Sequence, residues 1–281
     1  MTPTPSLHPL RTLTIHPDTS PEVLRAYAYL LDACRFPASV ILDSHHARIV
    51  SLCRRHLTRI ADILVSRFTL GDRNPILVST LCEYFPHIAG DTVRDAAHLI
   101  AARWHGQQDR GTLLCVASAI AGSPTLRKKL SRWLTDTAQS TTLPGLTYFE
   151  AAAAYLRAYP HARNRRDILR RFGLYLDSCD LTLLTPVELI TLHSLCPLWY
   201  DLRALHGLDL CTRTLPRTIA TTLSNLTTTH SSPTATTLST LLTLAETLEA
   251  ANYATLLDDT IRPSAPQKFE FDYLDYNVRH N

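Results

Sequence analysis

Residues 185–196 read TPVELITLHSLC, and this stretch holds the pattern that decides the fold. Thr185 and Glu188 have the spacing of a capping box, in which each side chain bonds the other residue's backbone N–H at a helix start. Pro186 lies between them at the first helical position, where a missing N–H leaves no bond unmade. Leucines then recur at three-to-four spacing as far as Cys196, which precedes a proline and therefore favours a helix end. The stretch predicts one amphipathic helix.

The same start signal, a cap-forming residue followed by proline, recurs along the chain. It is found at Ser20-Pro21, Asn74-Pro75, Ser123-Pro124, Thr185-Pro186 and Ser232-Pro233. The side-chain oxygen of Ser, Thr or Asn accepts a bond from a backbone N–H that has no other partner in the first turn. Asp91 has the position of a further cap, and Thr147 with Glu150 has the spacing of a second capping box.

Apolar residues follow each start at helical spacing, and residues 20–262 contain no convincing strand alternation. We therefore predict an all-α fold. Residues 111–122 are apolar on nearly all sides, which predicts a central helix. Residues 44–67 carry a long periodic pattern that fits either one helix or two.

The expected helices group into pairs whose first members begin near residues 21, 75, 112, 147, 186 and 233, at steps of 54, 37, 35, 39 and 47 residues. Steps of this size fit one helical hairpin each. The sequence thus predicts an array of antiparallel helical hairpins, an α-solenoid with an irregular repeat. We expect an extended N-terminal segment over residues 1–19, a helical-repeat domain over 20–262, and an extended aromatic and acidic tail over 263–281.

Composition excludes several classes of protein. Hydrophobic residues make up 45% and charged residues 19% of the 281 residues, which is typical of a folded globular chain. No run approaches the roughly 20 apolar residues of a membrane-spanning helix. The seven cysteines are scattered without a C-x-x-C pair, which favours buried free thiols over a disulfide framework or a zinc site.

Motifs that carry catalysis are missing from the sequence. It contains no G-x-S-x-G, P-loop or G-x-G-x-x-G motif, and its histidines give no metal-binding pair with an acidic partner. We therefore expect no enzymatic activity, no cofactor, no metal and no small-molecule substrate. An enzyme with an unrecognised site stays open as a minor alternative.

Positive charge is concentrated in the body of the chain. The net charge is +3, but residues 241–281 hold seven acidic and three basic side chains, which leaves a net +7 on residues 1–240. Three basic groups stand out, each on the second helix of an expected pair. They are Arg54, Arg55 and Arg59; Lys128, Lys129 and Arg132; and Arg163, Arg165, Arg166, Arg170 and Arg171.

Second helices line one side of a regular solenoid, so these groups are candidates for one basic stripe that faces RNA phosphates. The alternative is that each group is a solvated helix face with local ion pairs. A one-base-per-repeat RNA code is not expected, because the repeat is too irregular.

The tail has a different pattern. Phe269, Phe271 and Tyr273 alternate with acidic residues and are followed by Tyr276, which is typical of an extended segment. These rings are candidates for docking onto other protein subunits, and packing back onto the body is the alternative.

The last two expected units, which begin at Thr185-Pro186 and Ser232-Pro233, are the most alike. They resemble the degenerate helical repeats of mitochondrial ribonucleoproteins, above all those of euglenozoan protists, which often have an S/T-P start followed by leucines. They are only distantly similar to pentatricopeptide repeats. The resemblance implies a mitochondrial location, and a cytoplasmic one is the alternative. The N-terminus is hydroxyl-rich and acid-poor up to Asp18, as in a transit peptide, although four prolines interrupt it.

Two non-catalytic functions fit this sequence. The first is a non-catalytic subunit of a large mitochondrial ribonucleoprotein, such as a mitoribosome or an assembly or RNA-processing complex, which bridges proteins and touches RNA. The second is an RNA-free protein scaffold, for example an accessory subunit of a respiratory complex.

Overall fold

The chain is described from a computed structural model that covers residues 7–35, 44–106, 109–195, 221–222, 225, 234 and 236–245. Over these residues the structure contains helices, turns and loops but no strand, which confirms the all-α class. The elements are α1 (His8–Thr12), α2 (Pro21–Arg35), α3 (Ser44–Thr69), α4 (Pro75–Tyr84), α5 (Pro86–Ala102), α6 (Arg110–Ala119), η1 (Ile120–Gly122), α7 (Pro124–Gln139), α8 (Leu146–Ala158), α9 (Arg165–Ser178) and η2 (Leu181–Leu183). Residues 186–195 and 236–245 are also helical.

Four of the five proline-marked starts begin helices as predicted. The Ser20 hydroxyl accepts a bond from Val23 N–H at 3.4 Å, and Asn74 Oδ1 accepts one from Ile76 N–H at 2.8 Å. Ser123 caps α7 in the same way. The capping box at Thr185 is complete, because its backbone N–H donates to Glu188 Oε2 at 2.8 Å while its hydroxyl accepts from Glu188 N–H at 3.3 Å. The fifth start, at residues 232–233, lies outside the described residues.

The capping box predicted at Thr147 and Glu150 is wrong. Helix α8 begins at Leu146 after Gly145, and no side chain caps its first turn. Glu150 instead turns into the molecule and pairs with Arg110. Helix α5 consists of two helical parts joined at Gly90, whose φ of +62° lies in the left-handed region that glycine tolerates. Its longer part begins at Asp91, next to this kink and close to the expected helix start.

Two further segments differ from a simple reading of the sequence. Residues 44–69 form one continuous helix, which decides between the alternatives of one helix and two. Within the N-terminal segment that was expected to be extended, residues 8–12 form α1. Leu10, Leu13 and Ile15 are buried, and a ring nitrogen of His56 on α3 lies 2.6 Å from the Leu10 carbonyl oxygen. This part of the N-terminus therefore packs back onto the body.

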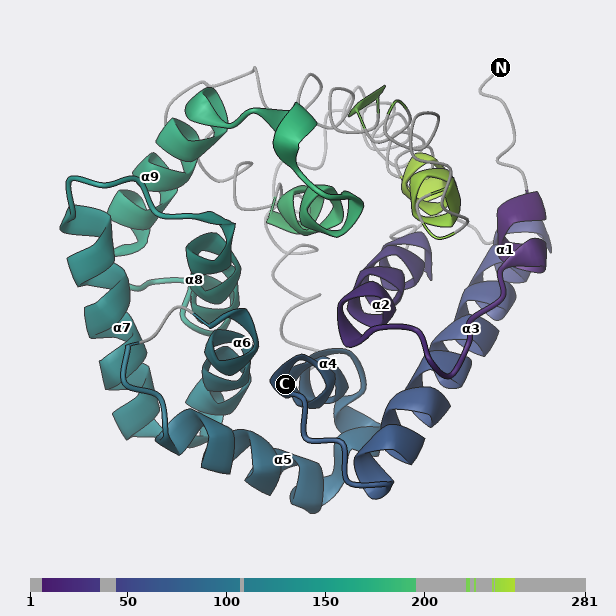
Figure 1. Cartoon of the computed structure of the whole chain (residues 1–281), viewed down its shortest axis with the longest axis horizontal. Helices are drawn as coiled ribbons and strands as arrows, with labels where there is room; N and C mark the ends of the chain where they lie inside the picture. Colours follow the sequence, from purple (N-terminus) through teal and green to yellow (C-terminus); the bar gives the residue numbers. More distant parts are fainter. Residues whose placement is uncertain are drawn as a thin grey trace, which may run out of the picture.

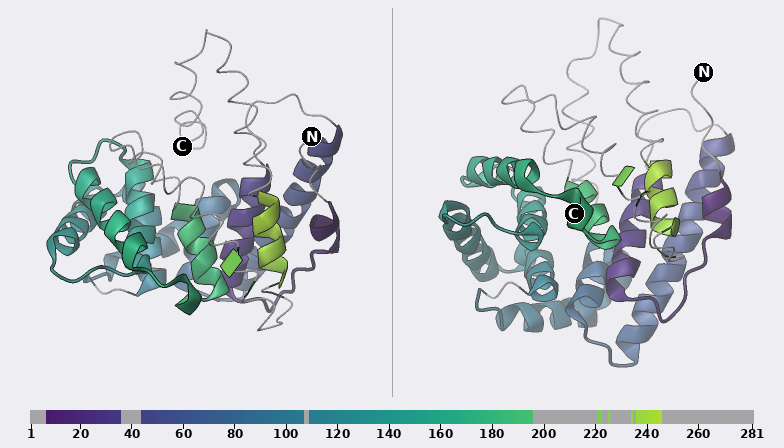
Figure 2. Two further views of the ribbon diagram at one scale, coloured as in Figure 1. Left: turned by 90° about the horizontal axis from the view of Figure 1, so that it is seen from above. Right: turned by 45° about the horizontal axis from the view of Figure 1, so that its top comes forward.

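Successive helices alternate between an inner and an outer layer. Figure 1 shows α2, α4, α6, α8 and residues 186–195 around the middle of the molecule, with α3, α5, α7 and α9 outside them. Each inner helix contacts the next inner helix, and α6 in the middle of the row is buried on nearly every side, as predicted. Viewed from two further directions, the helices lie side by side in a single slab (Figure 2).

The row of inner helices curves until its ends meet. Tyr29 on α2 lies beside His193 from the far end of the row, with the phenol oxygen 3.0 Å from His193 Nδ1 and the two rings edge to face. The inner layer therefore surrounds a centre to which α2, α4, α6, α8 and residues 186–195 all contribute side chains.

Candidate functional site

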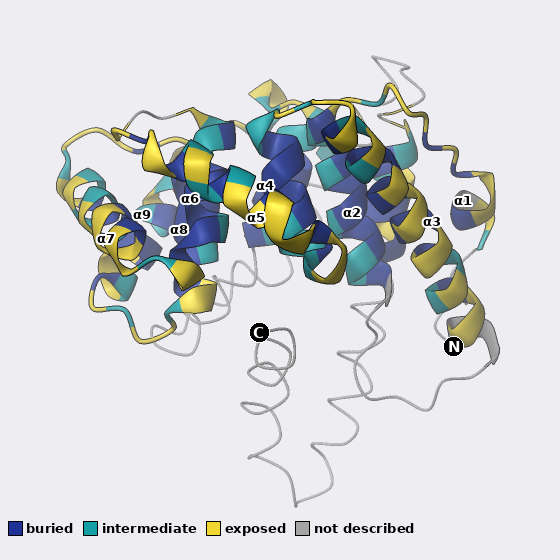
Figure 3. Cartoon of the chain, turned by 90° about the horizontal axis from the view of Figure 1, so that it is seen from below, coloured by how far each residue is buried: buried dark blue, intermediate teal, exposed yellow. Residues whose placement is uncertain are grey.

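The predicted cations lie on outer helices. Arg54, Arg55 and Arg59 are on α3, Lys128, Lys129 and Arg132 are on α7, and Arg165, Arg166, Arg170 and Arg171 are on α9, with Arg163 just before it. Second helices of the expected pairs thus share one layer in the described part of the chain. Figure 3 shows that exposed residues are concentrated on the outward sides of α3, α5 and α7.

Helix α7 separates its charged and apolar faces cleanly. Leu126, Leu130 and Leu134 recur every fourth residue and are buried. Lys128, Lys129 and Arg132 fall on the opposite side of the helix and are exposed. The spacing of the sequence therefore forces these three cations into solvent once the leucines enter the core.

Helix α9 lies along the C-terminal half of α7. The side-chain amide of the buried Asn164, just before α9, donates to Ser131 O at 3.4 Å and to Thr135 Oγ1 at 3.1 Å. About two turns later, Arg171 Nε donates to Ala138 O at 2.6 Å, and its Nη2 donates to Ser140 O. The two helices therefore run side by side in the same direction.

Arg171 and Arg165 differ from the other cations of the predicted RNA-contact set. Arg171 is half-buried and binds the carbonyl groups at the C-terminal end of α7, where a cation also opposes the negative end of the helix dipole. Arg165 is half-buried and donates to Pro160 O at 3.1 Å, and burial lowers its pKa. Both guanidinium groups are engaged in holding the chain together.

Six cations remain exposed on adjoining outer surfaces, and we call them the basic track. They are Lys128, Lys129, Arg132, Arg163, Arg166 and Arg170. Asp136 and Asp167 lie close to them in the sequence, but the part of the chain that the structure describes shows no ion pair to any of the six.

The three basic groups do not form one stripe. Helix α3 lies across the ring from α7 and α9 (Figure 1), so Arg54, Arg55 and Arg59 stand apart from the basic track. Sequence reasoning also missed Arg48, which is exposed on α3. Its position seven residues before Arg55 was the available signal, because residues seven apart share a helix face.

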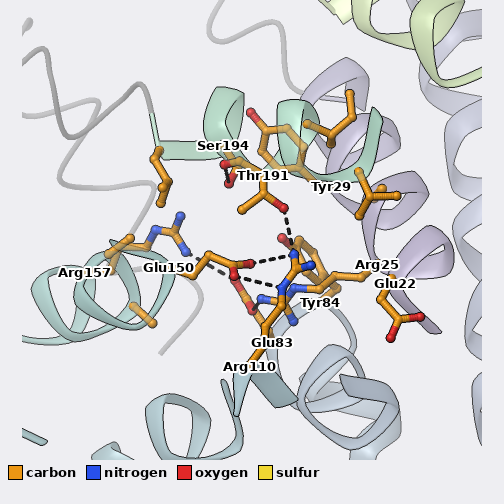
Figure 4. Close-up of a pocket in the computed structure, with 16 residues that line it drawn as sticks. Glu22, Arg25, Tyr29, Glu83, Tyr84, Arg110, Glu150, Arg157, Thr191 and Ser194 are labelled. Atoms are coloured by element: carbon orange, nitrogen blue, oxygen red, sulfur yellow. Dashed lines mark hydrogen bonds and ion pairs between the residues drawn. The ribbon is translucent and has the colours of Figure 1, made fainter. Parts of the chain in front are cut away.

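A second cluster, at the centre of the ring, was not predicted at all. We call it the polar centre, and Figure 4 shows its side chains converging from four inner helices and from residues 186–195. Glu83 on α4 accepts from Arg25 on α2 through Oε2 and from Arg157 on α8 through Oε1, the latter at 3.2 Å. The Arg25 guanidinium also lies 5.6 Å from the centre of the Tyr84 ring.

Both members of the Arg25–Glu83 pair stay charged. Burial would lower the pKa of Arg25, but Glu83, Tyr84 and Glu150 together outweigh it, so the pKa is raised. Burial would likewise raise the pKa of Glu83, yet Arg25 and Arg157 lower it. The charges therefore stabilise each other away from bulk water.

The other half of the polar centre joins α6 and α8 to the helical residues 186–195. Arg110 Nη2 donates to Glu150 Oε1 at 3.0 Å and to Thr191 Oγ1 at 2.8 Å. Arg110 Nε lies 2.9 Å from Glu150 Oε2 as an ion pair, although its N–H is not aligned for a hydrogen bond and both atoms are buried. The Glu150 side chain is only 7% exposed.

The cavity beside these residues has a volume of about 30 Å³, close to the volume that one water molecule occupies in the liquid. The described residues contain no group of three or more His, Cys, Asp and Glu placed to hold a metal ion. The arrangement suits a clamp that ties the inner helices together.

Three further findings concern the predicted tail residues, the character of the helices and the comparisons with known proteins. Phe269, Phe271, Tyr273 and Tyr276 lie outside the described residues. Among the described helices, none has the length and apolar character needed to cross a membrane. Comparison of the chain with protein-family models, with curated proteins and with solved structures finds no match.

Proposed function

We propose that the protein is a non-catalytic subunit of a ribonucleoprotein that contacts RNA phosphates through the outer faces of α7 and α9. The observation that carries the proposal is the basic track, six exposed cations on α7, on α9 and just before α9, with no ion pair to them in the described part of the chain. Sequence-independent binding of RNA rests on contacts of this kind between cations and phosphates.

Repulsion among the cations of the basic track destabilises the free protein, which supports a partner of opposite charge. Arg166 and Arg170 are four residues apart on α9, and like charges at this spacing destabilise a helix by about 0.2–0.5 kcal/mol. An anionic polymer alongside α9 reverses the sign of that contribution.

The finer architecture that we propose is an irregular array of antiparallel helical hairpins. The alternation of inner and outer helices supports it, because each hairpin of a solenoid places one helix in each layer. Such arrays present long surfaces to macromolecules. With the resemblance to the repeats of mitochondrial ribonucleoproteins, this supports a structural role in a mitoribosome or an RNA-processing complex of mitochondria.

Binding to RNA is tested by fluorescence anisotropy over a series of salt concentrations. We expect wild-type protein to bind a labelled RNA at low salt, with a log–log salt slope of about 0.7 per phosphate contact on a single strand. Replacing all six cations of the basic track by Gln lowers both affinity and slope. The matched control replaces Arg54, Arg55 and Arg59 on α3 by Gln and leaves binding near wild type.

The opposite result would favour the RNA-free scaffold. If wild-type protein binds RNA no better than the six-fold variant at low salt, the RNA role is wrong and the hairpin array serves protein partners alone.

A second variant that lacks residues 264–281 tests the tail separately. We expect it to fold normally and to leave its assembly, because the tail's aromatic residues are proposed to dock on neighbouring subunits.

A further inference from the structure

The basic track follows a single line across two helices. Lys128, Lys129 and Arg132 lie between the first turn and the middle of α7. Asn164 binds Ser131, next to Arg132, so α9 starts where the cations of α7 end. Arg166 and Arg170 then continue along α9 beside the C-terminal half of α7. The cations therefore succeed one another in one row instead of forming two rows side by side.

Hydrogen bonds at both ends of α9 fix its position along α7. Arg171 binds the carbonyl groups of Ala138 and Ser140, and Asn164 binds Ser131 and Thr135. With α9 fixed to α7 at both ends of their contact, the charges are held in place before any partner arrives. Such preorganisation reduces the ordering cost of binding.

The row runs over the outside of the ring. Figure 1 shows that α7 and α9 follow each other around its convex edge. A duplex is stiff over tens of nanometres and meets a convex surface only over a short length. A single strand is flexible and follows the curve from α7 to α9 with its phosphates toward the protein.

In the described part of α7 and α9, the aromatic rings are buried or partly buried against other rings and offer little surface for reading bases. Trp133 on α7 packs against Trp104 and Tyr148, with ring centres 5.8 and 5.5 Å apart. Tyr175 on α9 packs against Phe149 at 5.1 Å. Stacking platforms give other single-strand binders part of their affinity. Here RNA binding depends on the phosphate backbone of the RNA, so the base sequence has little influence on affinity.

Resting on the proposed function, we infer that one RNA strand crosses from α7 to α9 along the basic track, bound through its phosphates and without base preference. The partner is thus single-stranded RNA in preference to duplex RNA. Charge density alone predicts the reverse preference, because a duplex carries more charge per unit length and has a steeper salt slope per contact. A preference for the single strand therefore reports the shape of the surface.

The test measures anisotropy with two labelled probes of about 15 nucleotides, a uridine single strand and an RNA duplex of the same length. We expect the full-length protein to bind the single strand at least about tenfold more tightly, a gap of about 1.4 kcal/mol. An adenosine strand binds within about threefold of the uridine strand, since stacking contributes little.

Two half-track variants test continuity. Neutralising Lys128, Lys129 and Arg132, or Arg166 and Arg170, by Gln lowers the single-strand salt slope in both cases, by about 0.7 for each contact removed. The control variant carries Gln at Arg54, Arg55 and Arg59 and keeps the wild-type slope. Thermal unfolding of each variant checks that folding is unchanged.

The outcomes distinguish a failure of this inference from a failure of the proposed function. Duplex bound as tightly as the single strand, or a slope that only one half-track variant lowers, overturns the inference while RNA binding stands. Binding of neither probe overturns the proposed function itself.

Discussion

Among the charged side chains of the polar centre, Glu150 is one of the most deeply buried. Its carboxylate joins α8 to Arg110 at the start of α6, and Arg110 extends the link to Thr191. An ion pair that is removed from water is stable only while both partners are present, because the remaining charge has no solvent to replace the lost one.

Replacing Glu150 by Gln is therefore expected to lower the free energy of unfolding by about 3 kcal/mol, since Arg110 loses its counter-charge. Urea unfolding measures the change. The matched control is Glu22→Gln, which lines the same cavity but has no ion pair in the described part of the chain. The control should cost less than about 1 kcal/mol, its interaction with the start of α2. Equal losses for the two variants would contradict the account.

His193 makes the closure of the ring dependent on pH. Burial lowers its pKa to about 4, against about 6.5 in an unfolded chain. Because the unfolded state binds the proton more tightly, stability is full above pH 6.5 and falls as the pH drops from 6.5 toward 4, by about 3 kcal/mol. Burial also lowers the pKa of His56.

Urea unfolding at a series of pH values, on wild type and on His193→Gln, isolates this contribution. The difference in stability between the two proteins is expected to shrink as the pH falls, because only wild type has to protonate His193. A difference that stays constant from pH 6.5 to 4 would show that His193 does not carry the effect.

At the residue scale, the sequence predicted helix caps well and long-range polar pairs poorly. Thr185 and Glu188 are three residues apart, so their contact follows from local spacing alone. Thr147 and Glu150 have the same spacing, but Glu150 gains more from Arg110, 40 residues away, than from a cap. A local pattern contains no information about such a competitor.

At the scale of elements, the approach of α6 to α4 depends on Gly111. A Cβ atom added there would lie 2.9 Å from Pro75 Cβ and 3.3 Å from Ile76 Cγ1. Ala in place of Gly usually stabilises a helix. At this position the clash should outweigh that gain. Gly111→Ala is therefore expected to lower the free energy of unfolding by about 1–3 kcal/mol, as measured by urea unfolding. A gain in stability would show that α4 and α6 do not approach this closely.

Neighbouring arginines on α9 should separate folding from binding. Arg171→Met removes bonds to two carbonyl groups of α7 and is expected to lose about 2 kcal/mol in urea unfolding, with little direct effect on RNA affinity. Arg170→Met, an exposed change on the same helix, should alter stability by less than about 0.5 kcal/mol and weaken RNA binding. A stability loss for Arg170→Met and a binding loss for Arg171→Met would contradict the proposed roles of these two arginines.

The order of the helices was largely predictable, because each proline-marked start is a local signal. The placement of the basic groups on second helices also followed from that order. The engagement of Arg171 did not, since its partners lie at the end of another helix, 33 and 31 residues away.

At the scale of the whole molecule, the ring is the feature that no local pattern announced. Tyr29 and His193 are separated by 164 residues, and their contact results from small rotations added over every helix between them. This curvature separates α3 from α7 and α9, so the basic track and the exposed arginines of α3 lie on different sides of the ring.

We propose that α7 and α9 bind RNA on their outer faces. Ultraviolet crosslinking of the full-length protein to a single-stranded RNA of about 15 nucleotides, followed by mass spectrometry of the linked peptides, tests it most directly. The account predicts crosslinks within residues 127–133 and 163–171. Crosslinks confined to α3 or to the inner helices, with none on α7 and α9, would contradict it.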